Sequence, residues 1–528
     1  MLDEGACMLS ISTEKNKIIE LSNTSLSSFV EQYIWGHRIH DEQTPEMIFL
    51  EFLCILLDNK DSPLSTKTGG LGYVSNKRLR MRELIFKNPY LDLIDSDNTL
   101  DNDGKWAYWS EKFCNNAKYF DPCHSGKILE QLKSNFEKID GNTSSFKTFA
   151  NLIYLLRTIS FETGSSKRWT SNYVFPVGPN AVYADCNLEG EGDRRFFART
   201  GELLYLMLSR SDKSEELGEK LTQAFLSDNN PLNKGLDLLQ VTNDGGVMTL
   251  SDAMYLPDER CELFNQLADD WLAILNLKMP INDHIFFLCQ LSALYFIEYI
   301  LFKTKVVLGE QTDTNIVCEV VSTQNTKVRK LSADRFIQNN SLSSKALEKF
   351  IDTIQDDDVW KENLINYPDI ASHNIELICK YFHLSNKTKK EYEEKTNLDD
   401  ALNLLKENST KLHKTHLGLV HSVYAKSIGL ASNIRTNRTR YILSDQLLKT
   451  LIYANVKKRM VLHEFLDVLH KKYNIIIGQN EAQQYIDNKL CDADDFRYNL
   501  RVLEKRLDAL GLLFRLSDSY AYVQNPFS

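Results

Sequence analysis

Hydrophobic residues recur along most of the chain with the three-and-four spacing of amphipathic helices. In one segment Thr44 is a good N-cap and Pro45 takes the first helical position. The apolar residues that follow at helical spacing are Ile48, Phe49, Phe52, Leu53 and Leu56. The stretch "SSFKTFANLIYLLRTISF", which ends before residue 164, has the same pattern. The sequence therefore predicts a mainly α protein.

One apolar stretch, "HIFFLCQLSALYFIEYILF" from His284 to Phe302, is about long enough to span a bilayer. Gln290 and Glu298 lie inside it, and an acidic side chain costs roughly 2.5 kcal/mol or more at the bilayer midplane. We therefore expect a helix buried inside a helical domain and no membrane association.

Two segments differ in residue pattern from the helical stretches around them. Three β-branched runs separated by polar turns between Thr304 and Ser332 predict a small antiparallel sheet. The Ser/Asn-rich segment "QNNSLSSK", residues 338–345, predicts a linker or domain edge. At 528 residues two to four domains are expected. The expected parts are an N-terminal helical domain (1–164), a central mixed domain with the β element (165–340), a helical connector (341–425) and a C-terminal domain (426–528).

The C-terminal domain has the order of elements of a winged helix. Ser444 caps a first helix, and residues 461–472 form a second with its leucines and phenylalanine inward. The last helix ends at Gly511. Its predicted buried stripe consists of Phe496, Leu500, Leu503, Leu507 and Leu510. The runs "LLFRL" and "YAYVQ", joined by Ser517 and Asp518, predict a hairpin. The fold class is therefore a multidomain, mainly α (α+β) protein with a C-terminal winged helix.

The charge of the chain is distributed unevenly. With 62 Lys and Arg against 72 Asp and Glu the net charge is −10, so any basic surface must be local. Between residues 426 and 472, ten Lys and Arg stand against three acids. Five of these cations are the candidates Lys457, Lys458, Arg459, Lys471 and Lys472. On the last helix Arg497, Arg501 and Lys505 form one row at four-residue spacing, with Arg506 at its edge.

This row lies on the helix that can enter a major groove in a winged helix. Its cations could contact phosphates with strong salt dependence, and arginines at the helix start could reach base edges. The alternatives are a dock for an acidic partner protein or a plain solvated face. We predict duplex DNA, in preference to a single strand, as the ligand.

A second basic and aromatic patch surrounds a loop-like segment, residues 164–192. Its candidates are Lys167, Arg168, Trp169, Arg194, Arg195 and Arg199. Cations beside flat rings suit single strands or phosphates. The structural alternative, which we favour, pairs the arginines with Glu191, Asp193 and Glu202.

Familiar catalytic and cofactor motifs are absent from the sequence. There is no GxxxxGK[ST], GxSxG or HExxH. Two sets of candidate metal ligands do not have the sequence spacing of a known metal site. They are Cys114, Cys123 and His124, and His413, His416 and His421. We therefore predict no catalytic residue, no metal and no cofactor. A nuclease centred on residues 164–210 stays open, with Mg²⁺ held by Asp185, Glu189, Glu191 and Asp193.

Ten scattered cysteines and an N-terminus with acids and no apolar run favour a cytoplasmic protein with reduced thiols.

Two stretches carry a family resemblance: "RRFFARTGELLYLMLSRS", and the tail from "RYILSDQLLKTLIYANV" to "LEKRLDALGLLFRLSDSYAYVQNPF". They resemble accessory proteins of bacterial phage-defence and DNA-modification islands. The resemblance implies a subunit of an anti-phage defence complex that accompanies a helicase, ATPase or nuclease, and it brings no catalytic motif. We predict a non-enzymatic DNA-binding or scaffold subunit. A winged-helix adaptor that only docks another protein is a further alternative.

Overall fold

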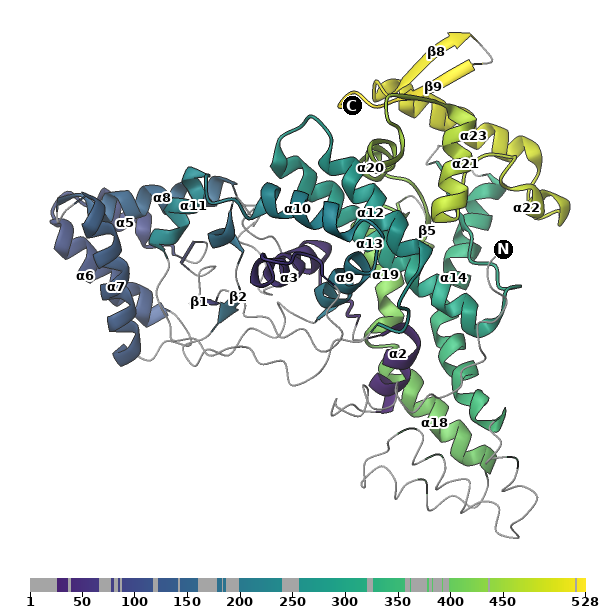
Figure 1. Cartoon of the computed structure of the whole chain (residues 1–528), viewed down its shortest axis with the longest axis horizontal. Helices are drawn as coiled ribbons and strands as arrows, with labels where there is room; N and C mark the ends of the chain where they lie inside the picture. The colour runs from purple at the N-terminus through teal and green to yellow at the C-terminus, as the bar shows by residue number, and fades with distance from the viewer. Residues whose placement is uncertain are drawn as a thin grey trace.

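Helices dominate the described part of the chain, which is mainly α as predicted (Figure 1). The computed structural model describes residues 26–36, 39–65, 77–79, 84–85, 88–116, 122–140, 143–159, 178–182, 184–186, 199–239, 256–320, 326–356, 398–434, 437–517 and 520–528, and the single positions 361, 378, 382 and 392.

An elongated arm forms one end of the molecule (Figure 1). Its helices are α5 (Leu91–Ser96), α6 (Asn102–Asn116), α7 (Pro122–Asp140), α8 (Ser145–Ile159) and α11 (Pro231–Leu238). They enclose a separate apolar core around Trp106, Trp109 and Phe149. The indole N–H of Trp109 donates to Asn88 at 2.9 Å, and that of Trp106 donates to Ser145 at 3.0 Å. Both buried indoles therefore keep a polar partner.

The large body is built around one long helix, α13 (Ile281–Leu308). Its neighbours include α2 (Leu26–Trp35), α3 (Pro45–Asp58), α12 (Glu262–Leu275), α14 (Lys327–Asp352), α19 (Leu417–Ser427) and α20 (Asp445–Asn455). Among the described residues α13 is long and apolar enough to cross a membrane, but 83% of its most apolar window is buried. That burial is typical of the core helix predicted for this stretch.

Two further helices of the body, α9 (Thr200–Ser209) and α10 (Ser214–Phe225), pack near α3. Gly201 allows the close approach, because a Cβ there would lie 2.6 Å from the Cβ of Glu51. The Glu51 carboxylate accepts from the backbone N–H of Gly201 at 2.8 Å, and the Gln43 side chain accepts from that of Thr200 at 3.0 Å. Side chains before and within α3 therefore cap the buried backbone N–H groups of the first turn of α9, which have no partner within the helix. The Thr44 cap of α3 is confirmed, since its hydroxyl accepts from the Met47 N–H at 3.4 Å.

The prediction of an antiparallel sheet between Thr304 and Ser332 is wrong. Helix α13 continues to Leu308, and α14 begins at Lys327. Among the residues described between them (309–320 and 326), the one strand is β3 (Ile316–Val317), which pairs in parallel with β7 (Ile475–Ile476). In this helical turn Thr304 is buried and Val307 packs against the apolar core, whereas Val306 is exposed, so packing on one face of the helix overrides the β preference of the run.

The prediction of a linker at residues 338–345 is also wrong, because helix α14 continues through these residues without interruption. Asn339 is buried there, and its side-chain amide donates to the carbonyls of Thr314 and Asn315 at 3.3 and 3.2 Å. Asn339 therefore has partners inside the fold, and the segment is part of a helix and not a loop.

The remaining elements are short or C-terminal. They are β1 (Lys77–Leu79) parallel to β2 (Ala184–Cys186), the 3₁₀ turns η2 (Pro179–Ala181) and η3 (Thr353–Asp356), α18 (Leu398–His413), β4 (Ala431–Ser432) antiparallel to β5 (Arg440–Tyr441), β6 (Arg459–Val461), α21 (Leu462–Tyr473), α22 (Gln483–Asp487), α23 (Ala493–Ala509), β8 (Leu513–Ser517) and β9 (Tyr520–Gln524).

Candidate nucleic-acid interface

Helices α20, α21 and α23 precede a hairpin of β8 and β9, in the predicted order. Strand β6, which was not predicted, adds to the hairpin and gives an antiparallel sheet of order β6-β9-β8. In its register Val523 faces both Met460 and Leu513. The hairpin projects from one end of the body (Figure 1).

Helix α23 is seated on the body by one face. Its buried residues are Phe496, Asn499, Leu503 and Leu507, whereas Leu500 and Leu510 of the predicted stripe are only partly buried. The Asn499 amide oxygen accepts from the N–H of Val320 at 2.8 Å, and its amide nitrogen donates to the carbonyls of Cys318 and Ile477 at 3.0 Å each. Asn499 therefore fastens the helix to the segments that follow β3 and β7.

The opposite face of α23 carries the predicted cationic row. Arg497, Arg501 and Lys505 are all exposed. Arg497 forms an ion pair with Asp494 at 3.0 Å, one turn earlier on the same helix. Arg501 and Lys505 have no ion-pair partner among the residues that the structure describes. Arg506 is turned toward the start of α20, where it pairs with Asp445.

The hairpin adjoins this row. Arg515 on β8 pairs at 2.7 Å with Glu504, the neighbour of Lys505 on α23. At the other edge of the sheet Lys457, Lys458 and Arg459 are exposed. The Arg459 guanidinium lies 4.4 Å from the centroid of the Phe514 ring, a cation–π contact across the sheet.

The two lysines predicted on α21 differ in their surroundings. Lys471 is exposed and pairs with Asp467 at 2.7 Å. Lys472 points into the body, where it pairs with the buried carboxylate of Asp270 on α12. Asp270 also accepts from the hydroxyls of Tyr295 and Tyr473 at 2.6 Å each. Burial raises the pKa of Asp270, and Lys472 and the hydroxyls act in the opposite direction.

Not all of the positive charge between residues 426 and 472 is on the surface. Arg440 is fully buried and pairs with Glu319, which also accepts from Arg329 at 2.8 Å. The side chains of Arg440 and Lys472 therefore neutralise buried acids, and the local excess of cations overstates the basic surface.

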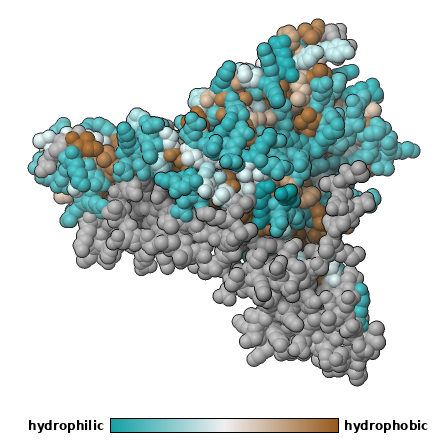
Figure 2. Space-filling model, in the orientation of Figure 1, coloured by the Kyte–Doolittle hydropathy of each residue, from teal (hydrophilic) through white to brown (hydrophobic). Residues whose placement is uncertain are grey.

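Exposed apolar side chains on the hairpin were not predicted from the sequence. Phe514, Leu516 and Tyr520 are 36%, 64% and 57% exposed. Figure 2 shows hydrophobic surface at the end of the molecule where the hairpin projects. The opposite face of the sheet holds the buried Leu513 and Val523, which alternate with these positions.

The second basic patch is mostly beyond the described residues. Lys167, Arg168, Trp169, Arg194 and Arg195 lie outside them, as do the nuclease candidates Glu189, Glu191 and Asp193. Only the backbone of Asp185, in β2, is described. Arg199 forms an ion pair with the buried Glu202 at 2.8 Å. This is the pairing with an acid that was favoured for the arginines of this patch.

The predicted histidines do not converge. Nδ1 of His413 lies 2.8 Å from a Glu31 oxygen and its Nε2 lies 3.0 Å from the Ser343 hydroxyl. His421 contacts Tyr441 at 2.7 Å, and burial lowers its pKa to about 4. His416 instead approaches a carboxylate far away in sequence, that of Asp41. Cys123 and His124 lie where side chains are not described.

Comparison with known proteins places the C-terminal region in a biological context. Residues 380–525 match the family model of the Methylation-associated defense system protein MAD7, a match that contains α23 and the hairpin. None of the curated proteins and none of the solved structures matches the chain. The match confirms the resemblance to accessory proteins of phage-defence islands. The C-terminal region of this chain is thus similar to the methylation-associated defense system protein MAD7, which indicates a role in a methylation-associated defence system.

Proposed function

We propose that residues 444–525 form a winged helix that binds duplex DNA, and that the chain is a non-enzymatic, cytoplasmic scaffold subunit of a bacterial anti-phage complex. The observation that carries this proposal is the exposed row of Arg501 and Lys505 on α23, free of ion pairs among the described residues, with the hairpin beside it. Other subunits, such as a helicase, ATPase or nuclease, would supply the chemistry.

The charges on α23 indicate which part of the helix contacts DNA. Asp494 and Asp495 lie in the first turn, and Asp494 already neutralises Arg497. Phosphates are repelled by these acids, so the contact is centred further along the helix, on Arg501 and Lys505. At the hairpin edge, Lys457, Lys458 and Arg459 would hold flanking phosphates. Lys472 and Arg506 contribute to the fold instead, through Asp270 and Asp445.

The test is fluorescence anisotropy of a labelled duplex of about 30 base pairs, titrated with the full chain at several salt concentrations. The double variant Arg501→Glu/Lys505→Glu should lose binding, because it replaces two phosphate-binding cations with repelling charges. The matched control is Lys345→Glu/Lys349→Glu, two exposed lysines at the same four-residue spacing on α14. Equal losses in both variants would show that only net charge matters and would refute a specific interface.

A protein-docking role is the second candidate, and the exposed Leu516 and Tyr520 at the hairpin favour it. In that case the chain has no affinity for DNA and co-purifies with a product of a neighbouring gene. Leu516→Asp/Tyr520→Asp would then abolish co-purification, whereas the Arg501→Glu/Lys505→Glu variant would retain it.

The nuclease alternative is tested in the same preparation. Metal-dependent cleavage of the duplex, abolished by Asp185→Asn or Asp193→Asn, would favour an enzyme centred on residues 164–210. DNA binding without turnover supports the scaffold.

A further inference from the structure

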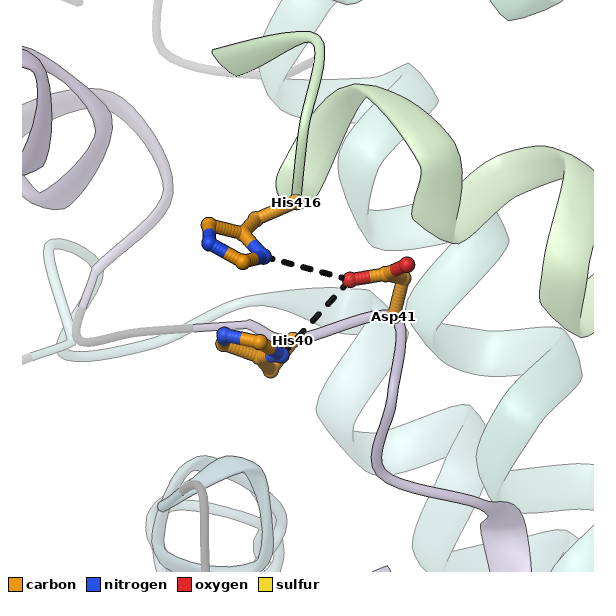
Figure 3. A group of neighbouring side chains, drawn as sticks. All are labelled: His40, Asp41 and His416. Carbon is orange, nitrogen blue, oxygen red and sulfur yellow. Dashed lines mark hydrogen bonds and ion pairs between the residues drawn. The ribbon is translucent and has the colours of Figure 1, made fainter. Parts of the chain in front are cut away.

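Three metal-ligating side chains meet between two distant segments of the chain. His40 and Asp41 lie between α2 and α3, and His416 lies in the turn between α18 and α19 (Figure 3). Nδ1 of His40 and Nδ1 of His416 are 3.6 and 3.5 Å from the same carboxylate oxygen of Asp41. All three ligand atoms lie within 4.8 Å of one another.

These separations fit a shared cation better than direct hydrogen bonds. A nitrogen–oxygen distance of about 3.5 Å is at the long limit of hydrogen bonding. In a tetrahedral site with metal–ligand bonds of about 2.1 Å, neighbouring ligand atoms are about 3.4 Å apart. The two distances to the Asp41 oxygen are within a few tenths of an ångström of this value, and the third separation is at most 4.8 Å, so small side-chain movements would bring all three atoms around one ion.

The two imidazoles also face one carboxylate oxygen together. Their ring centroids are only 4.1 Å apart, with an angle of 39° between the planes. A divalent ion satisfies both nitrogens and the oxygen at once.

The backbone around the group is held in place from several elements. The His40 N–H donates to the Thr200 hydroxyl at 3.2 Å, and the His40 carbonyl accepts from the Tyr424 hydroxyl of α19 at 2.9 Å. The carbonyl of His416 accepts from the Leu419 N–H at 2.9 Å, at the start of the same helix. The ligands are thus positioned before any ion binds.

We propose that His40, Asp41 and His416 bind a divalent transition-metal ion that joins the segment before α3 to the turn before α19. Two imidazoles with a single carboxylate suit Zn²⁺ and its neighbours, whereas Mg²⁺ and Ca²⁺ prefer oxygen ligands throughout. The side chains of His40, Asp41 and His416 are 24%, 13% and 46% exposed. A fourth coordination position therefore faces solvent, as in sites that exchange water or a small ligand.

The test uses the full chain after chelator treatment and alkylation of accessible thiols. Titration with Zn²⁺ in a calorimeter should show one ion per chain, and Co²⁺ should give the visible absorption of a tetrahedral site. Asp41→Asn and His416→Asn should each weaken Zn²⁺ binding by at least about tenfold, the loss usual for supporting residues of metal sites. The control is His463→Asn, an exposed histidine on α21 that should leave the affinity unchanged.

Folding is checked separately from binding. Without metal, the half-exposed His416→Asn variant should keep the far-ultraviolet circular dichroism and unfolding midpoint of the parent chain. With Zn²⁺ the unfolding midpoint should rise in the parent chain and in His463→Asn but not in His416→Asn. The reason is that a ligand that binds only the folded state stabilises that state. Absence of Zn²⁺ binding, or equal affinity in all four proteins, would overturn the proposal.

Discussion

The buried pair of Lys472 and Asp270 gives the sharpest stability prediction. Lys472 is 18% exposed and Asp270 1%, so Lys472→Met leaves a carboxylate deep in the body without its cation. Breaking a buried ion pair in this way costs about 3–5 kcal/mol. The hydroxyls of Tyr295 and Tyr473 still donate to Asp270, and the lysine is not fully buried. We therefore expect a loss of about 2–4 kcal/mol in the free energy of unfolding.

The assay is urea unfolding followed by circular dichroism, with midpoints compared at constant slope. Lys471→Met is the matched control, because the adjacent lysine is 73% exposed and its pair with Asp467 contributes under about 1 kcal/mol. The double variant Asp270→Asn/Lys472→Met should recover most of the loss, since it leaves no unpaired charge. Without Lys472, the pKa of Asp270 rises further above its unfolded value, so stability falls as pH rises. The deficit of Lys472→Met should be smaller at pH 5 than at pH 8.

Two outcomes would refute this reasoning. One is a Lys472→Met variant as stable as Lys471→Met, which would mean that Asp270 is solvated or neutral even without the charge of Lys472. The other is a double variant whose loss is the sum of the two single losses, because the residues would then not be coupled.

Three further predictions concern buried positions. Burial raises the pKa of Glu298 from 4.5 to about 8, so the contribution of Glu298 to stability is present below pH 4.5 and is lost as pH rises through 8. Glu298→Gln should therefore flatten the dependence of the free energy of unfolding on pH in this range, as measured by urea titrations. An unchanged pH dependence would contradict this prediction. Asn499→Ala should lower the free energy of unfolding by about 1–3 kcal/mol, because the Val320 N–H loses its acceptor, and a loss no larger than that of exposed Arg501→Ala would argue against the bond. Gly201→Ala should lower the thermal midpoint by overpacking α9 against α3, whereas an unchanged midpoint would show that the helices separate freely.

What could be predicted from the sequence is what depends on neighbours along the chain. The Thr44 cap and the burial of the 284–302 helix follow from local order, and both are present. The exposed row on α23 likewise follows from four-residue spacing.

Contacts between distant residues could not be predicted. Lys472 meets Asp270 across 202 positions, and His416 meets Asp41 across 375. A count of local charges treats Arg440 and Lys472 as surface cations, although each has a buried acid as its partner. The pairing of β3 with β7 was missed for the same reason, because neither two-residue strand has a signal without the other.

The proposed DNA interface is tested most directly by the salt dependence of duplex binding in Arg501→Gln/Lys505→Gln, which removes two charges without adding acids. The logarithm of affinity falls with the logarithm of salt concentration by roughly 0.9 for each phosphate neutralised. If both cations bind phosphates, the slope for the variant should be smaller than that of the parent by about 2. An unchanged slope with unchanged affinity would contradict the assignment of DNA to α23.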